Sequence, residues 1–152
     1  MSDFVDTDVR TRALALMGAE RSAVLALCHE GRPRCFQMAV ALEAEGRRVY
    51  LATSQDSSKY PMLLACPWVC LFFSAARNRD SDPQHAATLE VQGVVEPVAG
   101  AHKLQARQLL VARHGALEQF LCNPGTRILA VRMTRLVLTE RFQQVAVLDL
   151  DS

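Results

Sequence analysis

A strong excess of charge of either sign is absent from this sequence. Its 17 Lys and Arg residues almost balance its 16 Asp and Glu residues, so the formal net charge is +1, and like charges form no long block. Nucleic-acid binding and polybasic membrane attachment both depend on clustered basic side chains. The composition therefore argues against a nucleic acid or a membrane as a partner.

Long hydrophobic runs are missing too. A helix that spans a bilayer needs roughly 18 or more apolar residues in succession, and no segment comes near that length. The chain begins MSDFVDTD, which is acidic where a secretory signal peptide would be basic. We therefore expect a cytoplasmic protein. A length of 152 residues predicts a single domain, 1–152, that buries its core without disulfides.

Metal-binding spacings are also absent. The sequence has no CxxC motif and no Cys/His pairing at zinc spacing, and its four histidines are scattered. The cysteines, an odd number in apolar surroundings, are Cys28, Cys35, Cys66, Cys70 and Cys122. We interpret them as reduced, small hydrophobic side chains and predict no metal site.

The apolar residues that are present form short segments typical of strands. Alternating or continuous apolar patterns predict six strands, at 22–28, 34–42, 49–53, 68–73, 89–96 and 127–138. The turn HEGRP, residues 29–33, and the turn AEGRR, residues 44–48, join the first three strands into an antiparallel meander. Gly93 interrupts the fifth strand, which indicates a bulge or a close approach by another group.

Three segments outside these strands carry helical patterns. Residues 7–19 have the spacing of an amphipathic helix, and a short helix is expected around Met62 and Leu63. Residues 101–121 predict one helix or two, ended by the NPG segment at 123–125. Six antiparallel strands with helices at the joints predict a small α+β barrel.

Small hydroxyl residues gather where the third strand meets the short helix. The segment LATSQDSSKYPMLLACP, residues 51–67, contains Thr53, Ser54, Ser57, Ser58 and Lys59. A phosphate dianion needs several short donors and a positive charge at one place, and this segment offers both. Alternatively, Ser57 or Ser58 caps the helix and Lys59 lies in solvent. Capping accounts for one serine but not for four hydroxyl groups.

Four segments follow one another in a recognisable order between about Ser22 and Thr139. They are HEGRP, VYLATS, DSSKYPMLLACPWVCLFF and LEVQGVVEPV. In their order and spacing the chain resembles the pyridoxamine-phosphate-oxidase-like, FMN-binding split-barrel family. The resemblance implies an α+β fold with a six-stranded antiparallel split β-barrel and flanking helices. It also implies FMN as the cofactor and a homodimer with the flavin at the subunit interface. An apolar share of 50% agrees with a dimer, because one small barrel does not easily hide so much apolar surface.

The same resemblance assigns roles to individual residues. Phosphate binding falls to the hydroxyl and basic run, Thr53, Ser54, Ser57, Ser58 and Lys59. The second strand, which lays its backbone along the isoalloxazine ring in this family, corresponds here to Gln37, Met38 and Ala39. Thr88, just before the fifth strand, completes the set of cofactor-binding positions. No catalytic residue follows from the resemblance.

The chain departs from the pyridoxamine phosphate oxidase itself. That enzyme has an arginine on its second strand, a second arginine inside a Ser-Arg-Lys triplet, and an Arg-Gln pair before its fifth strand. The corresponding residues here are Phe36 with Gln37, then Ser58, then Ala87 with Thr88. The C-terminal segment also lacks the arginine and histidine substrate motif. We therefore expect FMN binding but no oxidation of pyridoxamine phosphate.

These observations predict a flavoprotein. The first hypothesis is an oxidoreductase in which FMN transfers a hydride or electrons to or from a small substrate that the sequence does not identify. The second is a non-catalytic module that binds a flavin, a deazaflavin or haem, because the wider split-barrel group binds each of these. A ligand-free structural dimer is a third, weaker hypothesis.

Overall fold

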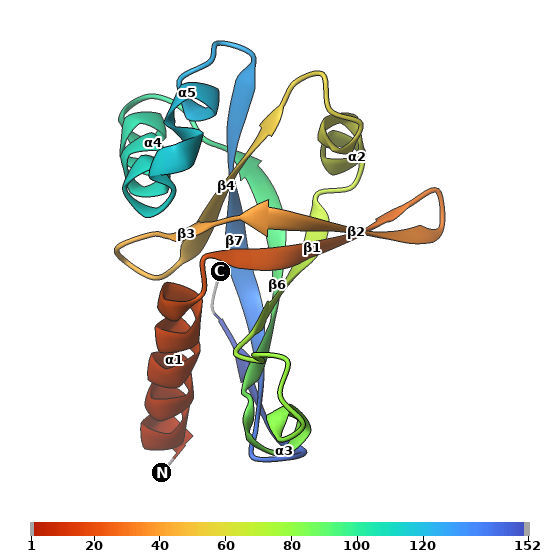
Figure 1. The fold of residues 1–152 in the computed structure, drawn as a ribbon, viewed down its shortest axis with the longest axis vertical. Coiled ribbons are helices and arrows are strands. Elements are labelled where there is room, and N and C mark those ends of the chain that lie inside the picture. Colours follow the sequence, from red (N-terminus) through yellow and green to blue (C-terminus); the bar gives the residue numbers. More distant parts are fainter. Residues whose placement is uncertain (1, 151–152) are drawn as a thin grey trace.

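The protein is described by a computed structural model that covers residues 2–150, and antiparallel strands dominate it (Figure 1). The strands are β1 (Ser22–His29), β2 (Arg32–Ala39), β3 (Ala41–Leu42), β4 (Arg48–Ser54), β5 (Trp68–Ser74), β6 (Thr88–Pro97), β7 (Thr126–Glu140) and β8 (Gln144–Asp149). They form one sheet in the order β2-β1-β5-β6-β7-β4-β3, and β8 pairs with β7. The sheet curls into a half-barrel around an apolar core, which confirms the predicted α+β split-barrel class.

Helices cover the ends and one flank of this sheet. They are α1 (Ser2–Ala19), α2 (Lys59–Ala65), α3 (Asp82–His85), α4 (Ala101–Arg113) and α5 (Glu118–Leu121), with a 3-10 turn, η1 (Gly115–Leu117), between the last two. The helix α1 places Val9, Ala13 and Met17 in the core at the expected helical spacing. None of the described helices has the length and apolar character to cross a membrane.

All six predicted strands are present, and the structure adds two. The predicted 34–42 strand is interrupted at Val40, whose amide bonds the Arg21 carbonyl, so that β2 and β3 are separate. The additional strand β8 follows a tight turn in which Arg141, Phe142 and Gln143 all have positive φ. Non-glycine residues rarely adopt that conformation, so composition alone gives little sign of this turn.

Gly93 marks a bulge, as predicted. The register between β6 and β7 shifts at Gln92 and Gly93. A Cβ atom on Gly93 would lie 2.5 Å from the carbonyl oxygen of Arg132 and 2.6 Å from a methyl group of Val131. Both parts of the prediction, the bulge and the close approach, are therefore confirmed.

Strand β4 lies between two apolar clusters, because alternate side chains of a strand point to opposite faces. Val49 and Leu51 belong to the core inside the half-barrel. Tyr50 belongs to a second cluster that packs the other face of β4 against α4 and α5, with Leu110 among its members. Between these clusters β4 runs toward Ser54, where the chain leaves the sheet for α2, and the candidate site lies at this end.

Candidate functional site

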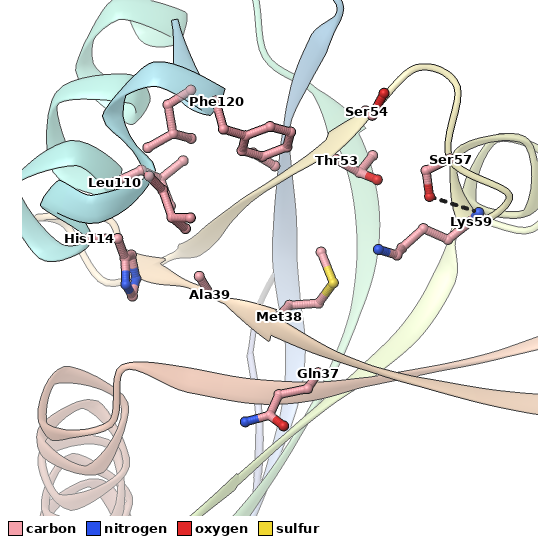
Figure 2. A pocket seen from close by; sticks show the side chains of 13 residues that line it. Gln37, Met38, Ala39, Thr53, Ser54, Ser57, Lys59, Leu110, His114 and Phe120 are labelled. Atoms are coloured by element: carbon pink, nitrogen blue, oxygen red, sulfur yellow. Dashed lines mark hydrogen bonds between the residues drawn. The ribbon is translucent and has the colours of Figure 1, made fainter. Parts of the chain in front are cut away.

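A cavity of about 330 Å³ lies between β2, β4, the start of α2 and the helices α4 and α5 (Figure 2). Its lining residues are Gln37, Met38, Ala39, Ala52, Thr53, Ser54, Ser57, Lys59, Leu110, His114, Leu117, Phe120 and Leu121. Seven of the nine residues proposed from the resemblance are in this set. The fold thus brings the two predicted groups, one on β2 and one after β4, to the two sides of one space.

Thr53 carries a buried hydroxyl group that has no hydrogen-bond partner in the described part of the chain. The residue is 2% exposed, and its Oγ1 atom is fully buried. Figure 2 shows its side chain directed toward the space that Ser57 and Lys59 also face. Buried polar groups in folded proteins are nearly always paired, since an unpaired one costs about 1–3 kcal/mol. An orphaned hydroxyl that lines a cavity therefore indicates a place for a polar ligand atom.

The serines near Thr53 take part in local turns. The Asp56 N–H donates to Ser54 Oγ at 3.2 Å, and the Lys59 N–H donates to Ser57 Oγ at 3.3 Å. Each hydroxyl acts as an acceptor in these bonds, so its proton remains available to a ligand. Ser54 lines the cavity, but its hydroxyl points away from the other polar groups in Figure 2. Ser58, the N-cap residue of α2, is exposed, makes no side-chain cap bond and does not line the cavity.

Lys59 brings a positive charge to this end of the cavity. Its Nζ atom lies 5.4 Å from the centre of the Phe36 ring, in the range of a cation–π contact. Among the described ion pairs none includes Lys59. The residue is partly buried, and Figure 2 shows its side chain extended toward Met38 and Thr53. It is therefore more than a solvated surface lysine, and its charge is available to an anion.

The opposite side of the cavity suits a flat, largely apolar group. Strand β2 is the end strand of the sheet, so half of its backbone N–H and C=O groups have no strand partner. Gln37, Met38 and Ala39 lie on this strand and line the cavity, while the Gln37 side chain donates to Ser22 Oγ at 3.2 Å. A planar heterocycle with polar edges could bond this free edge and stack beside it.

The helical wall of the cavity is a feature that the sequence analysis did not assign to the site. It consists of Leu110, His114, Leu117, Phe120 and Leu121, which follow one another through α4, η1 and α5. The sequence predicts one helix or two over residues 101–121, but not the strand that they cover. His114 Nε2 lies 2.8 Å from the Val40 carbonyl oxygen. Because a carbonyl can only accept, this nitrogen carries the proton.

Thr88 lies away from the cavity in this chain. It begins β6 and pairs with Thr139, near the end of β7, whereas Ser54 pairs with Thr126 at the beginning of β7. Most of the length of β7 therefore separates Thr88 from Ser54 and from the cavity. Among the side chains that the structure describes, no three of His, Cys, Asp or Glu gather closely enough to hold a metal ion.

Comparison with known proteins finds similar structures but no similar sequence. No protein-family model matches the chain, and no curated protein matches it either. A haem-binding protein from Mycobacterium smegmatis superposes with a TM-score of 0.79 at 18% identity, over 92% of this chain and 56% of that one. A Clostridium acetobutylicum protein of the pyridoxinephosphate oxidase family, related to general stress protein 26, has a TM-score of 0.70 at 14% identity, over 95% and 96%. An FAD-binding protein from Mesorhizobium loti has a TM-score of 0.68 at 15% identity, over 84% and 90%.

At these identities the comparisons establish the fold. The chain has the split-barrel fold that the resemblance implied, and it shares this fold with the C. acetobutylicum and M. loti proteins. Proteins named for flavin and for haem share this architecture. The chain spans little more than half the length of the M. smegmatis protein. The similarity is therefore limited to the barrel, and the rest of that protein has no counterpart in this chain.

Proposed function

We propose that this protein binds FMN in the cavity between β2, β4 and α4. The observation that carries the proposal is that a hydroxyl group without a hydrogen-bond partner and a positive charge without a counter-charge line the same cavity. Thr53 offers a buried hydroxyl with no partner, and Lys59 offers an ammonium group without a carboxylate among the described residues. Ser57 adds a third donor on the same side. A phosphate group would satisfy all three at once.

The remainder of the cavity supports a flavin ring. The volume of about 330 Å³ lies within the usual range for ligand pockets, and the lining is mainly apolar with a few polar groups at one end. The free edge of β2 offers backbone donors and acceptors to the polar edge of the ring. Leu117 and Phe120 on the helical wall would exclude water from one side of it.

Bound FMN would supply hydride or electron transfer, and the chain would bind and orient it. We propose that the protein is an oxidoreductase acting with a small-molecule substrate of a class still to be identified. The cavity lining contains hydroxyl groups, one lysine and one histidine, so the contribution of the chain is to hold the phosphate and shield the ring. The five cysteines form no disulfide, which supports a reducing, cytoplasmic location as part of this proposal.

Haem is a less suitable ligand for this cavity. His114 is the histidine among the described lining residues, and its Nε2 donates to the Val40 carbonyl at 2.8 Å. A nitrogen that carries a proton cannot ligate iron, so a haem held by this histidine would have to use Nδ1. The hydroxyl groups and the ammonium group at the other end remain suited to a phosphate. We therefore favour a flavin.

We further propose that two copies pair through the outer face of β1 and β5. Val24 on β1 and Phe72 on β5 are directly opposite each other in the sheet and are 37% and 44% exposed. Trp68, on the same face of β5, is 65% exposed. Large apolar side chains that cluster on a strand face are typical of an interface. A second copy on this face would make a homodimer, and the flavin would lie at the subunit interface as the resemblance implies.

Two measurements test the function. The purified protein is titrated with FMN, with haemin in parallel, and the FMN complex is then mixed with NADH or NADPH without oxygen. Saturable FMN binding followed by bleaching of the flavin supports an oxidoreductase. Binding of FMN that dithionite reduces but neither nucleotide reduces would instead identify a non-catalytic flavin module. Binding of haemin without any binding of FMN would overturn the proposal.

A further inference from the structure

Phe36 brings two cations together beside the cavity. The guanidinium carbon of Arg34 lies 5.3 Å from the centre of the Phe36 ring, and the Nζ atom of Lys59 lies 5.4 Å from the same centre. Both distances fall within the range of cation–π contacts. Arg34 reaches the ring along β2, whereas Lys59 reaches it from the first turn of α2. Because both are measured to one point, the two charges are separated by no more than about 11 Å.

Arg34 lies in a row that leads into the cavity. Alternate residues of a strand share a face, so Arg34, Phe36 and Met38 point the same way from β2. Burial increases along this row: Arg34 is exposed, Phe36 is partly buried, and Met38 is buried and lines the cavity. The guanidinium group is thus next to the polar end of the site without being part of its wall.

Neither cation has an acidic partner in the part of the chain that the structure describes. Arg12, Arg48, Arg77, Arg132 and Arg135 all pair with carboxylates among the described residues, but no described ion pair includes Arg34 or Lys59. Two like charges drawn to one ring repel each other, and an anion close to both would offset that repulsion.

We propose that Arg34 is the second cation of the phosphate site, held beside Lys59 by the ring of Phe36. This inference rests on the proposed FMN function and specifies how the site selects its ligand. Arg34 supplies a guanidinium group from β2, and Lys59 supplies an ammonium group from the start of α2. A guanidinium group can donate two parallel bonds to phosphate oxygens, and an ammonium group adds a compact charge. Together they favour a phosphate monoester dianion over the uncharged flavin.

Phe36 is a positioning residue in this arrangement, because it acts through Arg34 and Lys59. Phe36→Leu keeps an apolar side chain but removes the ring face that attracts both cations. We expect this variant to lose about 3- to 10-fold in FMN affinity and to keep its riboflavin affinity. A purely structural role for Phe36 would change the affinity for both flavins equally.

The direct test compares Arg34→Ala with Arg32→Ala. Arg32 is a matched control: it is exposed on the same face of β2, loses the same charge, and lies about 7 Å further along the strand with no ring contact. Titrations with FMN and with riboflavin at about 0.15 M salt limit long-range effects, since the Debye length is then about 8 Å. We expect Arg34→Ala to weaken FMN binding about 5- to 20-fold, Arg32→Ala less than about 2-fold, and neither to affect riboflavin.

Each other outcome overturns the inference. Equal losses of FMN affinity in Arg34→Ala and Arg32→Ala would mean that only the total positive charge of β2 matters. Equal losses for FMN and riboflavin would mean that Arg34 supports the fold and not the phosphate. If Lys59→Ala weakens FMN binding and Arg34→Ala does not, the proposed function stands and this inference fails. If the unaltered protein does not bind FMN, the proposed function and this inference fail together.

Discussion

The hydroxyl of Thr53 is held in place by β4 and is not used by the described part of the chain. The two neighbouring serines differ from it, because each already accepts a backbone N–H. Their turns place them near the cavity and leave their protons free. The candidate site is therefore formed from one unpaired group and from others with spare capacity. Ser58, the N-cap residue of α2, makes no side-chain cap bond, whereas Ser57 accepts the Lys59 N–H and still has a proton for a ligand.

The substitution Thr53→Val is expected to change the stability of the protein and its FMN affinity in opposite directions. Valine has nearly the shape of threonine but removes the unpaired buried hydroxyl, so we expect the ligand-free protein to be more stable by about 1 kcal/mol. For a chain of this length that corresponds to a rise in Tm of roughly 2–4 °C. FMN affinity should fall, and Thr53→Ser, which keeps the hydroxyl, should retain most of it. Thermal unfolding without ligand and FMN titration measure the two effects. A loss of stability in Thr53→Val would show that the hydroxyl already has a partner.

At the scale of elements, the local sequence pattern predicts where strands lie but not which elements pack against them. Alternation along 89–96 and the long apolar run 127–138 correspond to β6 and β7 within a few residues. The helical segment 101–121 divides at His114, whose φ of −132° and ψ of 65° are not helical. Its packing against β4 depends on contacts between distant segments, which periodicity does not encode. For this reason the polar side of the cavity was predictable and its apolar wall was not.

The resemblance explains a second limit on prediction. It supplied positions along the chain for the cofactor residues, and seven of them line one cavity. Ser58 and Thr88 do not, because one is turned to solvent at the start of α2 and the other begins β6 at the far end of the sheet. A residue that is matched to a distant family by its position in the sequence can therefore be placed in a site only when the strand pairing of this chain is known.

Gly93 tests the account of the β6 bulge. The added methyl group of Gly93→Ala would meet a backbone oxygen at 2.5 Å, and a backbone atom cannot move aside as the end of a side chain can. We expect the free energy of unfolding to fall by about 1–3 kcal/mol. Gly115→Ala is the control, since nothing lies within 4 Å of its added Cβ, and should change stability by less than about 0.5 kcal/mol. Denaturant unfolding measures both, and equal effects would contradict the close approach.

The outer face of β1 and β5 is the feature that matters at the scale of the whole molecule. Helices cover other parts of the sheet, whereas Val24, Trp68 and Phe72 remain exposed. Barrels that pair through such a face bury apolar surface that one copy cannot hide. The resemblance implies a flavin at the subunit interface, so the proposed flavin site and the proposed dimer are tested together.

Phe72→Glu tests the proposed pairing. The chain has a mass of 16.8 kDa, and we expect light scattering at micromolar concentration to give about twice that value for the unaltered protein. A charge at Phe72 should shift the protein to the monomer, because it would be buried without a partner in the interface. Leu104→Glu, at an exposed leucine of α4, should remain dimeric. A monomer in the unaltered protein would contradict both the dimer and a flavin shared between subunits.

The central claim is that the cavity binds FMN through its phosphate, and Lys59 gives the most direct measurement. Lys59→Ala removes a charge-assisted hydrogen bond worth about 1.5–3 kcal/mol, so FMN affinity should fall about 10- to 150-fold while riboflavin affinity stays the same. Lys103→Ala, which alters the other lysine of the chain outside the cavity lining, should change neither. Fluorescence quenching with both flavins measures the three proteins. Unchanged FMN affinity in Lys59→Ala, or an equal loss for FMN and riboflavin, would contradict the account.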